Sequence, residues 1–190
     1  VSLFSITVTD DGGTGSSGNG NGTVESGETI ALSPVMQETG GAGTANLTGV
    51  LSCAHPDVTV INDTTTFPAV GAGGFTNADT PFLVLFGPGI RDAAEVTFQL
   101  DVTDGSGNYL SEWSVVVQAP ELEVVSMDWE DQTFGNGDGI IENGERIVVT
   151  ARIKNFGTGT ADAVSGYFRS DVTNVVLADT TAGWSEVALM

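Results

Sequence analysis

A glycine-rich loop that ends in glutamate occurs twice in the sequence. Residues 18–28 read GNGNGTVESGE, and residues 135–145, which begin 117 positions further on, read GNGDGIIENGE. The polar residues at matching positions are Asn19, Asn21 and Glu28 in the first copy and Asn136, Asp138 and Glu145 in the second. Oxygen donors around a tight turn, closed by a glutamate that can bind through both oxygens, are the ligands that a hard cation requires. The spacing therefore predicts a Ca²⁺ site in each loop.

The segments around the loop show that it is not an EF-hand. The first ligand position of an EF-hand would fall on Ser17 or Phe134, and the flanking segments alternate like strands instead of following a helical period. A further ligand must therefore come from acidic residues upstream or from glutamates inside the loop. The candidates are Asp10, Asp11 and Glu25 in the first copy and Asp128, Glu130, Asp131 and Glu142 in the second.

An ordinary glycine-rich turn is the alternative interpretation of both loops. Asn and Asp often hydrogen-bond to the backbone of their own turn, and no ion is needed for this. Such a turn gives no reason, however, for glutamates to end both loops and to occur again three positions earlier. We therefore expect each loop to bind Ca²⁺ and to be poorly ordered without it.

The loop belongs to a longer internal repeat, whose later segments match at offsets of 116 or 117 residues. Many short alternating segments and 26 glycines favour an all-β fold, and a repeat of this length indicates a duplicated domain instead of a solenoid. With a boundary at Ala119–Pro120, we predict two tandem β-sandwiches, at residues 1–119 and 120–190. The matching segments are 2–8 with 122–129, 29–35 with 146–155, 41–46 with 157–162, and 60–65 with 176–181.

The second sandwich is predicted to be incomplete. The first copy continues with alternating segments at 80–86, 94–103 and 111–119, and the second has no equivalent of these. A sandwich without these strands exposes an apolar face and an unpaired edge, which can template another chain. Three explanations stay open: the sequence is a piece of a longer protein, a neighbouring subunit completes the fold, or the second copy is a reduced sandwich.

Composition excludes several classes of partner. The 25 acidic residues outnumber the 5 basic ones, for a net charge of −20, so the chain has no basic surface for nucleic acid. A single lysine argues against binding to anionic lipid. The sequence contains no run of 18 apolar residues, so we expect no membrane insertion. The acidic surface either keeps the protein soluble or collects divalent cations. The first residue, Val1, suits a mature, processed or excised piece.

The stretch GNGDGIIENGE, followed by RIVVTARIKNFGTGTADAV, resembles the immunoglobulin-like modules of secreted bacterial and archaeal proteins. Such modules follow extracellular peptidase domains or form strings in adhesin-like surface proteins. The N-x-G-x-G-x-A turn of that family fits Asn155, Gly157, Gly159 and Ala161, whereas Asn143 and Ser26 stand where proline is common. The resemblance implies an extracellular or cell-surface location and a structural or adhesive role. It covers the first copy and the second up to its early end.

Three classes of function are compatible with these features. The first is a non-catalytic, calcium-stabilised structural or adhesive module, whose partners are copies of itself, adjacent domains of a longer chain or a surface ligand; a variant is a filament subunit joined by strand exchange. The second is an accessory carbohydrate-binding module that uses Trp113, Trp129 or Trp184. The third is an enzyme. We expect no enzyme, because Cys53 and His55 lack the further ligands of a zinc site and no carboxylate pair stands out.

Overall fold

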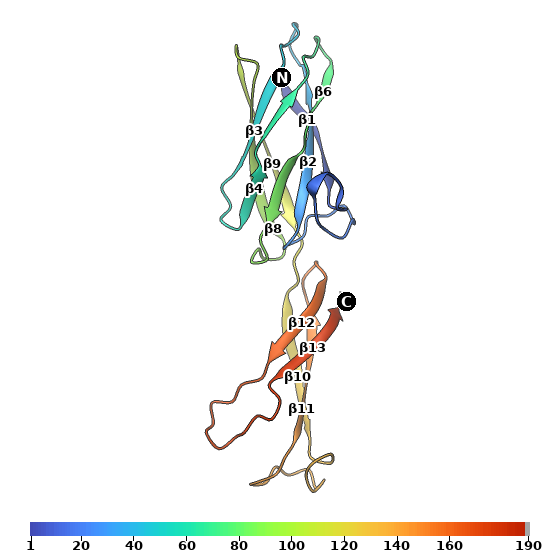
Figure 1. The fold of residues 1–190 in the computed structure, drawn as a ribbon, viewed down its shortest axis with the longest axis vertical. Coiled ribbons are helices and arrows are strands. Elements are labelled where there is room, and N and C mark those ends of the chain that lie inside the picture. Colours follow the sequence, from blue (N-terminus) through green and yellow to red (C-terminus); the bar gives the residue numbers. More distant parts are fainter. Residues whose placement is uncertain (189–190) are drawn as a thin grey trace. The chain divides into compact units, whose positions relative to one another are not determined.

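The computed structural model describes residues 1–188, and its regular elements are β-strands apart from one short 3₁₀ turn, η1 (Gly13–Gly15) (Figure 1). The predicted all-β class is confirmed. The chain divides into two compact units, Val1–Ala119 and Pro120–Met190, which we call unit 1 and unit 2.

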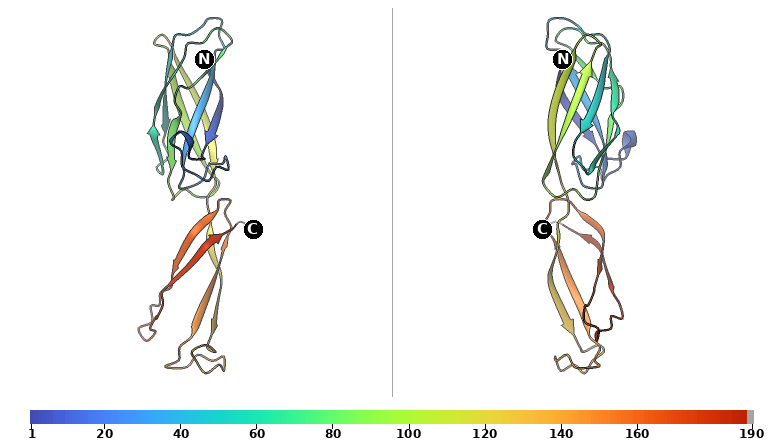
Figure 2. Two further views of the ribbon diagram at one scale, coloured as in Figure 1. Left: turned by 45° about the vertical axis from the view of Figure 1, so that its right-hand side comes forward. Right: turned by 90° about the vertical axis from the view of Figure 1, so that its left-hand side faces the viewer.

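Unit 1 contains two antiparallel sheets. The first has the order β1-β2-β7-β4, with β6 also paired to β2, and the second has the order β5-β3-β8-β9. The sheets pack face to face (Figure 2), as expected for strands in which apolar and polar residues alternate. The strands are β1 (Ser2–Thr9), β2 (Thr29–Gln37), β3 (Leu47–Cys53), β4 (Val58–Asn62), β5 (Thr64–Phe67), β6 (Phe75–Asn77), β7 (Phe82–Phe86), β8 (Ala94–Thr103) and β9 (Asn108–Val117).

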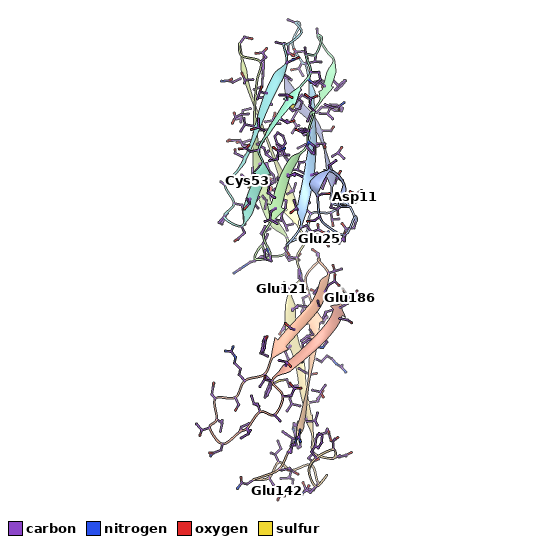
Figure 3. The ribbon with its side chains drawn as sticks, in the orientation of Figure 1. Asp11, Glu25, Cys53, Glu121, Glu142 and Glu186 are labelled. Atoms are coloured by element: carbon purple, nitrogen blue, oxygen red, sulfur yellow. The ribbon has the colours of Figure 1, made fainter. Side chains whose placement is uncertain are left out.

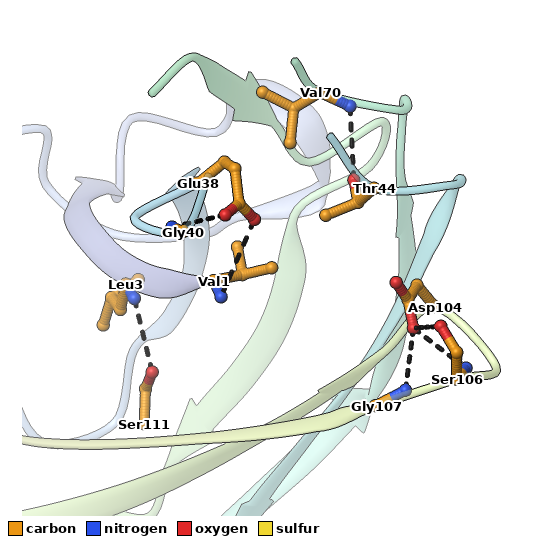
Figure 4. A network of polar contacts seen from close by, with 10 residues as sticks. All are labelled: Val1, Leu3, Glu38, Gly40, Thr44, Val70, Asp104, Ser106, Gly107 and Ser111. Atoms are coloured by element: carbon orange, nitrogen blue, oxygen red, sulfur yellow. Dashed lines mark hydrogen bonds and ion pairs between the residues drawn. The ribbon is translucent and has the colours of Figure 1, made fainter. Parts of the chain in front are cut away.

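The hydrophobic core of unit 1 lies between these sheets. In β8, Val96, Phe98 and Leu100 are buried, and the residues between them are exposed. Burying each large apolar side chain contributes about 1.5–3 kcal/mol, so the core is the main source of stability in this unit. Across one edge of the sandwich, Leu3 N–H donates a hydrogen bond of 3.3 Å to the Ser111 hydroxyl and so links β1 to β9 (Figure 4).

The turn between β8 and β9 is held by one carboxylate. Asp104 Oδ1 accepts hydrogen bonds from Ser106 N–H, the Ser106 hydroxyl and Gly107 N–H, at 2.8–2.9 Å (Figure 4). The Ser106 backbone N–H is the largest of the influences that lower the pKa of Asp104. This turn fixes the continuous register of the two ten-residue strands.

Unit 2 contains two separate two-stranded sheets, β10-β11 and β12-β13. In Figure 2 the two ribbons approach each other near one end and diverge toward the other. The strands are β10 (Leu122–Glu130), β11 (Val148–Asn155), β12 (Ala161–Tyr167) and β13 (Thr181–Val187).

The strand pairs of unit 2 reproduce two pairs of unit 1. The β1-β2 ladder has an irregularity after the pair Leu3–Met36, and the β10-β11 ladder has one after the pair Val124–Ile153. Equivalent positions are 121 residues apart in β1 and β10, and 117 residues apart in β2 and β11. Likewise, β3-β5 and β12-β13 keep one register at an offset of 117, since Leu47 faces Phe67 and Val164 faces Trp184.

Counterparts of the other strands of unit 1 are not present among residues 120–188. In unit 1, β7 and β6 pair with β2, and β8 pairs with β3; residues 168–180 of unit 2, by contrast, contain no strand. Core positions are consequently open in unit 2: Val124, Met127 and Trp129 are 54%, 58% and 44% exposed. Within the described residues, unit 2 is therefore not a closed sandwich.

Candidate cation-binding loops

Two carboxylates hold the loop between β1 and β2. Asp10, the first residue after β1, is 3% exposed, and its two oxygens lie 3.2 and 3.3 Å from the Gly22 nitrogen, whose N–H they accept. Glu28, the last residue before β2, accepts the Asn19 N–H through Oε1 at 3.0 Å. Each strand thus supplies one carboxylate to the loop that joins them.

Asn19 connects the interior of this loop to a third carboxylate. Its side-chain amide donates to Glu25, which is 8% exposed and is labelled in Figure 3. Its Oδ1 accepts the Asn21 N–H at 3.0 Å, and Asn21 in turn accepts the Thr23 N–H at 2.7 Å. The asparagines therefore shape the turn, as the alternative interpretation expects, but they do so beside carboxylates.

Glu28 carries an unsatisfied charge. Its Oε2 is buried, and it has no hydrogen-bond partner among the described residues. Burial raises the pKa of Glu28, and the nearby charges of Glu25 and Asp10 act in the same direction. A buried carboxylate oxygen without a partner is unfavourable, so the loop has an excess of negative charge that a cation would relieve.

The loop between β10 and β11 repeats this arrangement. Asp131, 3% exposed, accepts the Gly139 N–H at 2.9 Å, and Glu145 Oε1 accepts the Asn136 N–H at 3.0 Å. The Asn136 amide donates to Glu142 at 3.1 Å; Glu142 is labelled in Figure 3. The loops differ in two respects: Glu142 is exposed whereas Glu25 is buried, and Glu145 Oε2 accepts the Glu142 N–H at 3.0 Å whereas Glu28 Oε2 has no such partner.

Two glycines allow the terminal glutamates to approach the loop backbone. A Cβ atom at Gly18 would lie 2.6 Å from Glu28 Oε1 and 2.7 Å from the Asp10 carbonyl oxygen. A Cβ at Gly135 would meet Glu145 Oε1 and the Asp131 carbonyl oxygen in the same way. Both positions therefore require glycine because of close packing, a reason separate from the positive φ angles of Gly20, Gly22, Gly137 and Gly139.

The structure selects among the upstream acids. Asp10 and Asp131 reach the loops, whereas Asp11 accepts the N–H of Gly13 in an exposed turn and Asp128 is exposed on β10. Glu130 accepts hydrogen bonds from the Thr133 hydroxyl and N–H, which lower the pKa of Glu130.

The offset of 117 concealed this equivalence in the sequence, because it aligns Asp11 with Asp128. Asp10 and Asp131 are 121 positions apart, since the first copy has four more residues before its loop, the stretch that contains η1. The signal that identifies both is that each is the first residue after its strand. Aligning the two strands by their bulges therefore finds the pair.

The residues of both loops fit the chemistry of a hard cation. In the first loop Glu25 and Glu28 contact Asn19 and Asp10 contacts Gly22, and these side chains offer the oxygen donors that Ca²⁺ requires. Within residues 1–188, however, no group of three or more His, Cys, Asp or Glu side chains converges closely enough to form a metal centre by itself. Amide, backbone carbonyl or water oxygens would thus have to supply several ligands.

The other sequence candidates occupy structural positions. His55 N–H donates to Cys53 Sγ at 3.5 Å within one turn, and the Trp113 ring stacks on Phe98 at 5.5 Å. Trp184 packs against Gly166 just as Phe67 packs against Gly49. Trp129 is exposed because it lies on the open face of unit 2, at the place of Val8 in unit 1.

No helix in residues 1–188 is long and apolar enough to cross a membrane. No family model matches the sequence, and no curated protein matches it. Among solved structures, the crystal structure of BcpA, the major pilin subunit of Bacillus cereus, is similar over 96% of this chain and 67% of the pilin chain, at 12% identity and a TM-score of 0.25. A likeness at this level carries no argument about fold or function.

Proposed function

We propose that the chain is a non-catalytic structural module of an extracellular or cell-surface protein, and that Ca²⁺ stabilises the loop in each of its units. One observation carries the proposal: the same contacts among glycine N–H groups, asparagines and carboxylates occur in both loops, although the surrounding sequence has diverged. An ordinary turn would not need a buried aspartate at its start and a glutamate bonded to its backbone at its end.

The proposed role of the ion follows from the position of the loops. Each loop joins the end of one strand to the start of its neighbour, and its carboxylates lie close to the ends of both strands. Ca²⁺ would neutralise the mutual repulsion of Asp10, Glu25 and Glu28 and so hold these two strand ends together. Calcium sites of extracellular modules bind at about 0.1–1 mM, a range that suits a module outside the cell.

The resemblance to immunoglobulin-like modules of secreted proteins supports the same proposal through the loop and the N-x-G-x-G-x-A turn. In the structure that turn is built around Asn155, whose side chain donates to the Gly159 carbonyl at 2.8 Å and accepts the Gly157 N–H at 3.0 Å. Asn155 Oδ1 also accepts the Glu121 N–H at 3.0 Å, so the motif joins β11 to the start of unit 2. The motif therefore acts as a structural link in this unit.

Calorimetry on the intact chain tests the proposal. We expect titration with CaCl₂ to show two binding events, and Ca²⁺ at 100 times its Kd to raise the free energy of unfolding by about 2.7 kcal/mol. MgCl₂ is the control, because Mg²⁺ gives up its water ligands reluctantly. Melting curves that are identical in chelator and in calcium would contradict the proposal.

A further inference from the structure

Within the described residues of unit 2, no strand pairs with the outer edge of β11. Its counterpart in unit 1, β2, pairs with β1 on one side and with β7 and β6 on the other. Within residues 120–188, β11 pairs with β10 alone. An open strand edge is a row of unpaired backbone donors and acceptors, which another strand can satisfy.

The outer face of β11 carries basic side chains, although Glu123 of β10 lies opposite Lys154 on that face. Arg152 and Lys154 lie on the face that corresponds to the outer face of β2, and Arg146 precedes the strand. These are three of the five basic residues in a chain with 25 acidic ones. The complementary strand is therefore expected to be acidic.

Strand β9 of unit 1 ends its sheet and has no strand from residues 1–188 paired to its outer edge, although the Ser111 hydroxyl accepts the Leu3 N–H and the next residue, Gln118, is bonded to the first loop. It ends the order β5-β3-β8-β9, it is ten residues long, and no register shift interrupts its pairing with β8. It also has no proline or lysine, the residues that usually protect edge strands. On its outer face Leu110 and Val116 are 58% and 61% exposed, on either side of the acidic Glu112.

We propose that β9 of one copy adds to the open edge of β11 of a second copy, as an antiparallel pair with Glu112 opposite Arg152. This register pairs the outer faces residue by residue, and each pair is compatible. Apolar Val116 faces Val148, the Ser114 hydroxyl faces that of Thr150, and Leu110 faces the aliphatic stem of Lys154. A shift of one residue would direct Glu112 to the other face of β11.

Charge favours a second copy as the occupant of this edge. Unit 1 contains 13 of the 25 acidic residues and only one basic residue, Arg91, so its edge strand suits the basic β11. Because β9 and β11 are different surfaces, the contact is heterologous and can repeat from copy to copy. The residues paired in this contact lie outside both glycine-rich loops, and the variants tested below change no loop residue, so its failure can be distinguished from a failure of calcium binding.

A disulfide between copies tests the register directly. Opposite residues of an antiparallel pair have Cβ atoms about 4.5–5.5 Å apart, close enough for cysteines to form a disulfide after a small adjustment. Two proteins are made in a Cys53→Ser background, one with Ser114→Cys and one with Thr150→Cys, and they are mixed under mild oxidation in calcium. We expect a covalent heterodimer. The control replaces Thr150→Cys by Ser165→Cys on β12, the other open sheet.

A charge exchange provides a second, independent measurement. By sedimentation, Glu112→Arg alone and Arg152→Glu alone should each weaken self-association by about tenfold, and the double variant should restore it. Circular dichroism checks that each variant is folded. Self-association that both single variants leave unchanged, a chain that stays monomeric, or crosslinking through Ser165→Cys in place of Thr150→Cys would each overturn the proposal.

Discussion

Asp10 and Asp131 occupy the same position in the two units, although they lie 121 residues apart and the loops they bind lie 117 apart. Each is the first residue after its strand, each is 3% exposed, and each accepts the N–H of the glycine at the same point of its loop. Asp11 and Asp128, the nearby acids that the 117-residue offset aligns, share none of these three properties. This difference provides matched variants for testing the loops.

Asp10→Asn should lower the calcium affinity of the first loop by about tenfold or more, because ligand charge largely sets the affinity of such sites. The amide keeps an oxygen that can accept the Gly22 N–H, so the loop should still fold. Calcium titration by calorimetry measures the effect. Asp11→Asn, which removes an equal charge one residue away, is the control. Equal losses in the two variants would show that only the overall charge matters.

Glu28→Gln should stabilise unit 1 in chelator and abolish its stabilisation by calcium. The variant removes the buried charge of an oxygen that has no hydrogen-bond partner, and it also removes a proposed ligand. Thermal melting with and without calcium measures both effects. Glu95→Gln, on the exposed face of β8, is the control for the loss of one charge. A variant less stable than the wild type in chelator would mean that the carboxylate is already satisfied.

The raised pKa of Glu28 predicts a pH dependence in chelator. The folded state holds this proton more tightly than the unfolded chain, so the contribution of Glu28 to stability is fully present below the ordinary pKa of 4.5. It is lost as the pH rises through the raised pKa. The difference in Tm between wild type and Glu28→Gln, measured from about pH 4 to pH 7, isolates this group from the other acids. In calcium the difference should change in favour of the wild type as the pH rises, because the ion binds the ionised form of Glu28 and the variant lacks this ligand.

Gly18→Ala should destabilise unit 1 by about 1–3 kcal/mol, the usual range for overpacking. The added methyl group would lie 2.6 Å from Glu28 Oε1, so either the glutamate or the loop must move. Urea unfolding measures the loss. Gly41→Ala is the control, because a Cβ there meets nothing within 4 Å and its φ angle is not positive. Calcium affinity should fall in the first variant only.

The sequence alone was sufficient for the class of fold and the position of the loops. Period-two alternation predicted β1, β2, β8 and β11 to within a few residues, because one face of each strand must be apolar where sheets pack. The repeat also identified Asn19, Glu25 and Glu28 with their counterparts, since residues close together in one loop need no long-range contact to meet.

Only the tertiary structure decided which upstream acid joins each loop and which strand edges are open. Asp10 and Asp11 are indistinguishable by type and spacing, and the bulge and end of β1 determine which one turns inward. The edge of β11 was recognised by comparison with β2, its counterpart in unit 1, which pairs with the distant strands β6 and β7. No local pattern in the sequence encodes that pairing. Local propensity acts over a few residues, whereas strand pairing is set by the packing of the whole sheet.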